Sequence, residues 1–200
     1  MNNVKLAWSS TARKMLLPMV GVATSLILMG CSSMNVDPDS SASKRDKAES
    51  KLGYKPEVRP VKSAEEEVNA ISSKLLDWMG VQGKVTQPGA ALGTCEAIDP
   101  ELKTHYKVQH PWSVYDLKKG TFEEAMKNLR QKLPKHGWTI TKDGETKSEA
   151  RNPEIVAENA STHHVVRVEW AKNRSGGLKQ LISVDVDSRC YEAPEGTQLK

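Results

Sequence analysis

The sequence QLISVDVDSRCY, residues 180–191, alternates apolar and polar side chains from Ile182 to Asp187. Ile182, Val184 and Val186 share one parity, and Asp185 and Asp187 share the other. This period of two predicts a strand with one buried face and one solvated face. Cys190 falls on the parity of the apolar residues, so we expect it to point inward.

Further strand patterns precede this one. Trp138 to Thr141 leads to the hairpin-prone pair Asp143-Gly144, and two more alternating stretches complete an antiparallel meander. Earlier in the chain, a run that contains Cys95 and a run interrupted at Pro111 also indicate strands, with Trp112 packed inward at a bulge or edge kink. The stretches are Ala91 to Ile98, Tyr106 to Val114, Glu154 to Glu158 and His164 to Trp170.

Two amphipathic helices are predicted. The first begins at Ser63, whose spacing to Glu66 fits a capping box, and ends near Met79, before Gly80. Residues 80–90, with three Gly and a Pro, indicate a loop. The second helix begins at Thr121 and ends at Pro134 and Gly137.

The order of these elements is α-β-β-α-β-β-β-β. The most economical assembly is an α+β fold, a two-layer sandwich in which two helices pack on one face of an antiparallel sheet of about five or six strands. We expect it to form a single domain over residues 63–200, because about 138 residues are enough for one core.

The N-terminal region carries a different signal. Lys5, Arg13 and Lys14 precede an apolar run over residues 15–29, which is the layout of an export signal. The run ends in Leu28-Met29-Gly30-Cys31, which resembles the lipobox of bacterial lipoproteins. The resemblance implies a signal peptide over residues 1–30 and a lipidated Cys31, with palmitate-type acyl chains, at the extracytoplasmic face of the cell membrane.

Two alternatives compete with the lipobox: an uncleaved membrane-spanning anchor and an ordinary cleaved signal. Fifteen helical residues reach only ~22 Å, short of the ~30 Å hydrocarbon core, and Pro18 interrupts the run. The two acyl chains of a diacylglycerol at Cys31 would by contrast hold the protein durably, with no protein contact with the bilayer. The lipid anchor at Cys31 is therefore the favoured interpretation.

Residues 31–62 are rich in Ser, Asp, Lys, Pro and Glu, which predicts a disordered tether after the lipidated cysteine. Three of the 29 basic residues and none of the 25 acidic ones lie in the first 30 positions, so the mature chain is nearly neutral. A basic footprint for nucleic acid is absent from this sequence, and we expect no nucleic-acid partner.

The remaining cysteines agree with export. Once Cys31 is acylated, Cys95 and Cys190 form an even pair, which in an oxidising compartment predicts a disulfide between the first and last strands of the domain. The chain as a whole resembles small secreted lipoproteins of actinobacteria whose function is undetermined. The resemblance rests on the lipobox, the tether and the local strings Trp112-Ser113-Val114, Gly137-Trp138 and Cys190-Tyr191. That resemblance implies no catalytic motif.

The sequence contains few residue patterns that are typical of a catalytic or metal-binding site. His163 and His164 are adjacent and would point to opposite faces of a strand, so no metal site is expected, and no cofactor. Asp185 and Asp187 share a face and could bind Ca²⁺ or act as acid and base, but the favoured interpretation is the solvated side of a strand, which the alternation demands in any case. The tryptophans at 78, 112, 138 and 170 could stack on ligands, although each occupies a position typical of the core.

From these patterns we expect a non-enzymatic lipoprotein whose domain binds an envelope protein, a peptide or another envelope ligand. One alternative is an envelope enzyme with a site assembled from His110, Asp185 and Asp187. The other is a structural spacer in the envelope.

Overall fold

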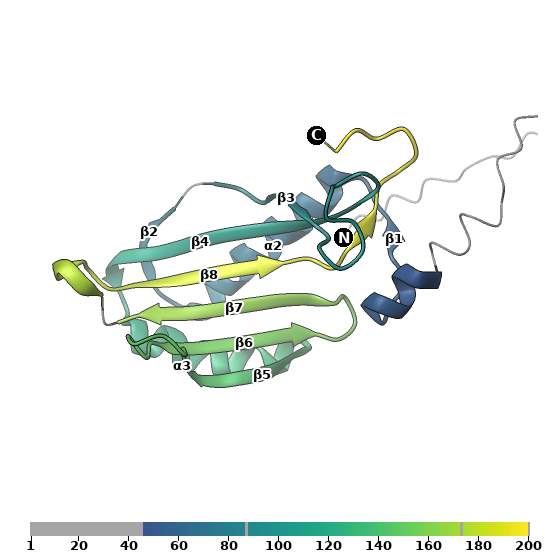
Figure 1. Ribbon diagram of the computed structural model, residues 1–200. Coiled ribbons are helices and arrows are strands. Elements are labelled where there is room, and N and C mark those ends of the chain that lie inside the picture. Colours follow the sequence, from purple (N-terminus) through teal and green to yellow (C-terminus); the bar gives the residue numbers. More distant parts are fainter. Residues whose placement is uncertain (1–45, 87, 173, 200) are drawn as a thin grey trace, which may run out of the picture. The chain divides into compact units, whose positions relative to one another are not determined.

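The computed structural model describes residues 46–86, 88–172 and 174–199, which form an α+β fold around one large mixed sheet (Figure 1). The strand order is β1-β9-β4-β8-β7-β6-β5, and β2 and β3 also pair with β4. All pairings are antiparallel except that of β1 with β9. The strands are β1 Glu57–Val58, β2 Gln82–Val85, β3 Ala91–Thr94, β4 His105–Lys119, β5 Trp138–Glu145, β6 Pro153–Asn159, β7 His164–Ala171, β8 Leu181–Asp187 and β9 Tyr191–Glu192.

The predicted class is therefore confirmed, but the expected sheet was too small and wholly antiparallel. With nine strands the sheet exceeds the five or six expected, and one pair is parallel. The additional strands β1, β2 and β9 have two to four residues each. Segments this short carry too little alternation for a period of two to be recognised.

Two long helices, α2 (Val61–Met79) and α3 (Phe122–Lys132), cover the same face of the sheet (Figure 1). Short 3₁₀ turns follow at Pro134–His136 (η1) and Ser175–Gly177 (η2), and residues 46–52 are also helical. Helix α3 has the predicted capping box at Thr121 and Glu124. Helix α2 instead begins after Pro60, which lacks a side-chain cap, so the expected box at Ser63 is wrong.

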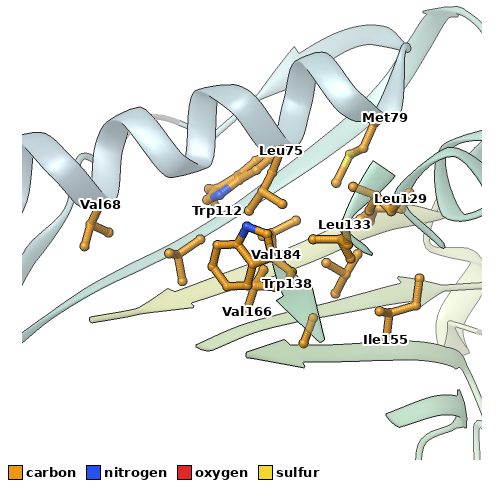
Figure 2. Close-up of a cluster of buried hydrophobic side chains, with 14 of the residues drawn as sticks. Val68, Leu75, Met79, Trp112, Leu129, Leu133, Trp138, Ile155, Val166 and Val184 are labelled. Carbon is orange, nitrogen blue, oxygen red and sulfur yellow. The ribbon is translucent and has the colours of Figure 1, made fainter. Parts of the chain in front are cut away.

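The core lies between the helices and the sheet. Figure 2 shows Val68, Leu75 and Met79 of α2 pointing toward side chains of the sheet and toward Leu129 of α3. On the sheet side the buried set includes the residues predicted from alternation, among them Trp112, Val166 and Val184. Leu75 has no exposed surface. The parity of each long strand thus identified the face that the helices cover.

The expected interruption of strand pairing at Pro111 occurs on one edge of β4 only. Strand β4 runs without a break from His105 to Lys119, and Pro111 pairs with Asp185 of β8. On the other edge of β4, pairing with β3 ends at Gln109 and pairing with β2 begins at Val114. Pro111 lies in this gap, the position in the strand at which a missing N–H costs least.

The expected hairpin at Asp143-Gly144 does not form. Both residues belong to β5 and pair with Ile155 and Glu154 of β6. The chain reverses later, where the Thr146 N–H donates to the Asn152 carbonyl at 2.8 Å. A two-residue turn motif is only a local preference, and pairing with β6 overrides it here.

Residues 46–60, called the strap below, differ from the expected tether because they contact the domain. The Tyr54 hydroxyl accepts from the Cys190 N–H at 2.8 Å, and Arg189 donates to the Lys55 carbonyl at 2.7 Å. The Arg59 N–H donates to the Glu192 carbonyl at 2.9 Å. A polar composition favoured disorder, but these backbone groups find partners on the sheet edge. For residues 31–45, which lie outside the described part, the tether stays a prediction.

Candidate functional site

The cysteines are the first of the predicted site residues. Cys31 lies outside the described residues, so its lipidation stays a prediction. Cys95 follows β3 and Cys190 precedes β9, and their Cα atoms are 5.8 Å apart. Because disulfides usually join Cα atoms 4.4–6.8 Å apart, the two form a disulfide-capable pair, as the sequence predicted.

The loop beside Cys95 is fixed by one carboxylate. Asp99 Oδ2 accepts from the backbone N–H groups of Lys103, Thr104 and His105 at 2.7–2.9 Å. Burial would raise the pKa of Asp99, but these hydrogen bonds hold the pKa below its ordinary value. The network therefore holds the turn between Cys95 and β4 in place.

Although His110, Asp185 and Asp187 all line one hollow, the His110 imidazole bonds on the opposite side of the sheet from the two carboxylates. His110 has the parity of the buried Val108 and Trp112, and its ring nitrogens bond on the helix side of the sheet. Nδ1 lies 2.8 Å from Ser72 Oγ, and Nε2 donates to the Pro88 carbonyl at 2.7 Å. The two aspartates have the opposite parity on β8, so they share the other face of the sheet.

On that face, which the helices leave uncovered, a hollow of about 400 Å³ crosses four strands. We call it the open-face hollow; its lining is Ala91, Leu92, Gln109, His110, Pro111, Arg167, Asp185, Val186 and Asp187. Burial raises the pKa of Asp185 above its ordinary value, and the neighbouring charge of Asp187 adds to the effect. The hollow is therefore polar, with a partly desolvated carboxylate in its wall.

A second depression, of about 430 Å³, lies between α2 and the end of the sheet formed by β5 and β6. We call it the α2 groove; its lining is Glu67, Ala70, Ile71, Lys74, Trp78, His136, Trp138, Asn159 and Thr162. Residues 67, 71, 74 and 78 follow one another at steps of three and four, so they form one stripe along α2. The groove thus has a helical wall on one side and the sheet end on the other.

The apolar part of the groove is aromatic. Trp78 and His136 stack with ring centroids 4.3 Å apart and an interplanar angle of 8°. Trp138 is almost fully buried, and Figure 2 shows its indole beside the core. Trp112 and Trp138 are buried, as expected for core tryptophans. Trp78 is only half-buried, so this expectation is met less completely there.

The polar end of the groove is held by a partly buried network around Glu67. Its Oε2 atom accepts from Arg59 at 2.7 Å and from the Tyr191 hydroxyl at 3.1 Å. The Tyr106 hydroxyl donates to the Arg59 carbonyl at 2.7 Å, and burial raises the pKa of Tyr106 to about 12. The contacts from Arg59 and Tyr191 both use one carboxylate oxygen, so Glu67 is fixed while it still lines the groove.

His164 lies behind Glu67 with no exposed surface, and its Nε2 is 3.7 Å from Glu67 Oε2. Neither ring nitrogen has a hydrogen-bond partner among the described residues. Burial lowers the pKa of His164, and the neighbouring guanidinium groups of Arg59 and Arg189 add to this, against the opposing charge of Glu67. The ring is therefore held neutral beside a carboxylate.

Sequence reasoning missed the groove. The sequence indicated Trp78 and Trp138 as possible stacking platforms, but Glu67 and Lys74 were not recognised, although they lie on the predicted first helix at the spacing of one face. Arg59 was assigned to the tether. His136 and Asn159 come from elements more than fifty residues away from α2, so only the tertiary fold could add them.

Comparison of the chain with protein-family models, with curated proteins and with solved structures found no match. Among residues 46–199, apart from positions 87 and 173, no group of three or more His, Cys, Asp or Glu could hold a metal ion. Nor does this part of the chain contain a helix long and apolar enough to cross a membrane.

Proposed function

We propose that this chain is a lipoprotein anchored through Cys31 at the extracytoplasmic face of the cell membrane, and that its domain binds an envelope ligand without acting on it. The lipobox resemblance at residues 28–31 supports the anchor. The disulfide-capable pair Cys95 and Cys190 agrees with an oxidising compartment, where we propose that the bond forms.

The observation that carries the binding role is the α2 groove. Its volume of about 430 Å³ falls within the usual range for small-ligand sites, and it combines apolar aromatic walls with a few polar groups. Glu67 is fixed from behind by Arg59 and Tyr191, so its carboxylate is oriented before a ligand arrives. Preorganisation of this kind lowers the entropy that binding must overcome.

The enzymatic alternative built on His110, Asp185 and Asp187 receives no support from this geometry. The imidazole is engaged with Ser72 and Pro88 on one face of the sheet, and both carboxylates lie on the other. A base and an acid that act on one substrate must lie within reach of the same atoms.

The anchor is tested by a Cys31→Ala variant grown with labelled palmitate. We expect the wild-type protein to incorporate label and to stay with membranes at high salt, and the variant to do neither. The control is Cys95→Ala, which leaves the lipobox intact and should still be acylated. Continued acylation of Cys31→Ala would contradict the assignment.

Occupancy of the groove is tested by chemical footprinting of histidines with diethyl pyrocarbonate. His136 is exposed and lines the groove, whereas His105, at the start of β4, does not. We expect His136 to react several times more slowly in intact membranes than in purified protein, and His105 to react similarly in both. Equal reactivity of His136 in the two preparations would favour a spacer over a binding protein.

A further inference from the structure

The open-face hollow contains a carboxylate whose surroundings are unusual for a strand surface. Asp185 lies at the centre of a cross-strand row, with Pro111 of β4 on one side and Arg167 of β7 on the other. Directly opposed strand residues on one face have Cβ atoms about 5 Å apart. Arg167 is therefore placed to pair with Asp185.

That pairing is not made. The Arg167 guanidinium donates instead to Glu154 Oε1 at 2.8 Å, and Lys142 contacts the other oxygen of Glu154. Burial would raise the pKa of Glu154, but these two cations outweigh it and hold the pKa below its ordinary value. Glu154, which is only 3% exposed, is thus the ion-pair partner of Arg167.

The hydrogen-bond donors of β4 near Asp185 also have other partners. Gln109 donates to Asp187 Oδ1 at 2.7 Å, and Lys107 lies 3.2 Å from the same oxygen. Within the described residues, Asp185 has neither a hydrogen-bond donor nor an ion-pair partner. The wall of the hollow therefore contains one carboxylate, Asp185, without a hydrogen bond or an ion pair in the described part of the chain, although the nearby charge of Arg167 acts on it. Its acidic neighbours Asp187 and Glu154 both have cationic partners.

The rest of the wall around this charge includes apolar groups. Pro111 presents a ring without an N–H donor, and Ala91 of β3 lies one strand further, opposite Gln109. A ligand that satisfies both features has a compact cation at one end and methylene groups behind it. An ammonium on an alkyl chain meets this description because it carries three donors on a flexible stem.

We propose that the open-face hollow is a binding site for a primary alkylamine of the lysine side-chain type, with its ammonium group against Asp185 and its methylene stem along Pro111 and Ala91. A divalent cation fits less well. Ca²⁺ takes six to eight oxygen ligands, whereas here two carboxylates are flanked by Lys107 and Arg167. This site is separate from the α2 groove, which lies on the helix side of the sheet.

The test uses the full chain and the probe Nα-acetyl-lysine N-methylamide, with binding measured by calorimetry. The matched probe is Nα-acetyl-norleucine N-methylamide, which keeps the stem and lacks the charge. We expect the lysine probe to bind and the norleucine probe to bind about tenfold more weakly or not at all, because a hydrogen bond to a charged group is lost.

The matched variants are Asp185→Asn and Asp77→Asn. The first removes the charge of the unpaired carboxylate, and the second removes a charge from α2, on the covered side of the sheet. We expect Asp185→Asn to weaken the lysine probe about tenfold while its melting temperature stays near that of the wild type, and Asp77→Asn to bind normally. Lowering the pH should weaken binding to the wild type as Asp185 takes up a proton.

Three results would overturn the proposal: equal binding of both probes, unchanged binding by Asp185→Asn, or no binding of the lysine probe to the wild type at millimolar concentration. None of them bears on acylation at Cys31 or on footprinting at His136, so they leave the proposed function to its own tests.

Discussion

The protonation state of one imidazole, that of His164, decides the net charge of the buried cluster beneath the α2 groove. His164 is enclosed between Glu67 on α2, Arg59 on the strap and Arg189 before β9. Protonation would place a buried cation near two guanidinium groups, with only the Glu67 carboxylate to compensate it. The folded protein therefore favours the neutral ring, and this preference connects its stability to pH.

The pKa of His164 lies below its ordinary value of 6.5 in the folded state, so the unfolded chain binds more protons at acid pH. Its stabilising effect is present above pH 6.5 and is lost as the pH falls from there through the folded pKa. We expect the unfolding free energy to fall between pH 7 and pH 5.5 by up to ~1.4 kcal/mol per pH unit from this group, measured by urea denaturation.

His164→Leu should show a smaller fall over the same range, because the titrating group is gone. The control is His136→Gln, which removes an exposed histidine and should keep the wild-type pH dependence. If His164→Leu and the wild type lost stability in parallel, the buried imidazole would not be the cause.

The burial of Leu75 predicts a large loss of stability when this side chain is shortened. Leu75 is fully buried where α2 meets the sheet, as Figure 2 shows. We expect Leu75→Ala to reduce the unfolding free energy by ~2–5 kcal/mol, because it removes buried methyl groups and leaves a cavity. Leu178→Ala, at a residue 58% exposed, is the matched control and should change the unfolding free energy by less than ~0.5 kcal/mol.

At the scale of elements, the two helix starts show how far a local pattern can be trusted. Ser63 with Glu66 and Thr121 with Glu124 have the same spacing, yet only the second pair makes the box. Thr121 Oγ1 accepts from the Glu124 N–H at 3.1 Å, and Glu124 Oε2 accepts from the Thr121 N–H at 2.9 Å. Helix α2 starts two residues earlier, so Ser63 already lies within its first turn.

This difference predicts unequal costs for the same substitution. Thr121→Ala should lower the unfolding free energy by ~1 kcal/mol, because α3 loses a cap for its first backbone donors. Ser63→Ala should cost less than ~0.5 kcal/mol. Thermal or urea unfolding of the two variants side by side provides the measurement, and equal costs would contradict the assigned starts of the helices.

Long elements could be predicted from the sequence and short ones could not. Strand β7 and the buried parity of β4 and β8 follow from alternation over seven or more residues. Strand β1 has two residues, and its pairing with β9 depends on a contact between segments more than 130 residues apart. No local pattern encodes such a contact. The groove was missed for the same reason, since α2 supplies one wall and residues 136–162 the other.

At the scale of the whole molecule, Cys95 and Cys190 are 95 residues apart in the chain, and a disulfide between them would connect the loop after β3 with the entry to β9. In the chain-entropy account, closing a loop of this length stabilises the folded state by ~4–5 kcal/mol. Strain in the folded state can reduce the gain, and the usual range on removal is ~2–5 kcal/mol.

We therefore expect a Cys95→Ala, Cys190→Ala double variant to unfold at a lower urea concentration than the oxidised wild type, by ~2–5 kcal/mol of free energy. Dithiothreitol should destabilise the wild type and leave the double variant unchanged. Two free thiols in the mature wild-type protein, detected by mass analysis without reduction, would remove the disulfide from this account.

With a lipid anchor at Cys31, as proposed, the contacts of the strap would also limit the distance between the domain and the bilayer. If the lipid is attached at Cys31, only about 15 residues separate it from the helical residues 46–52, and a fully extended chain of that length reaches at most ~50 Å. A free segment as far as residue 62 would reach about twice as far. The open-face hollow and the α2 groove would then reach only ligands within a thin layer next to the lipid headgroups. A ligand fixed further away in the envelope would have to project into that layer to be bound.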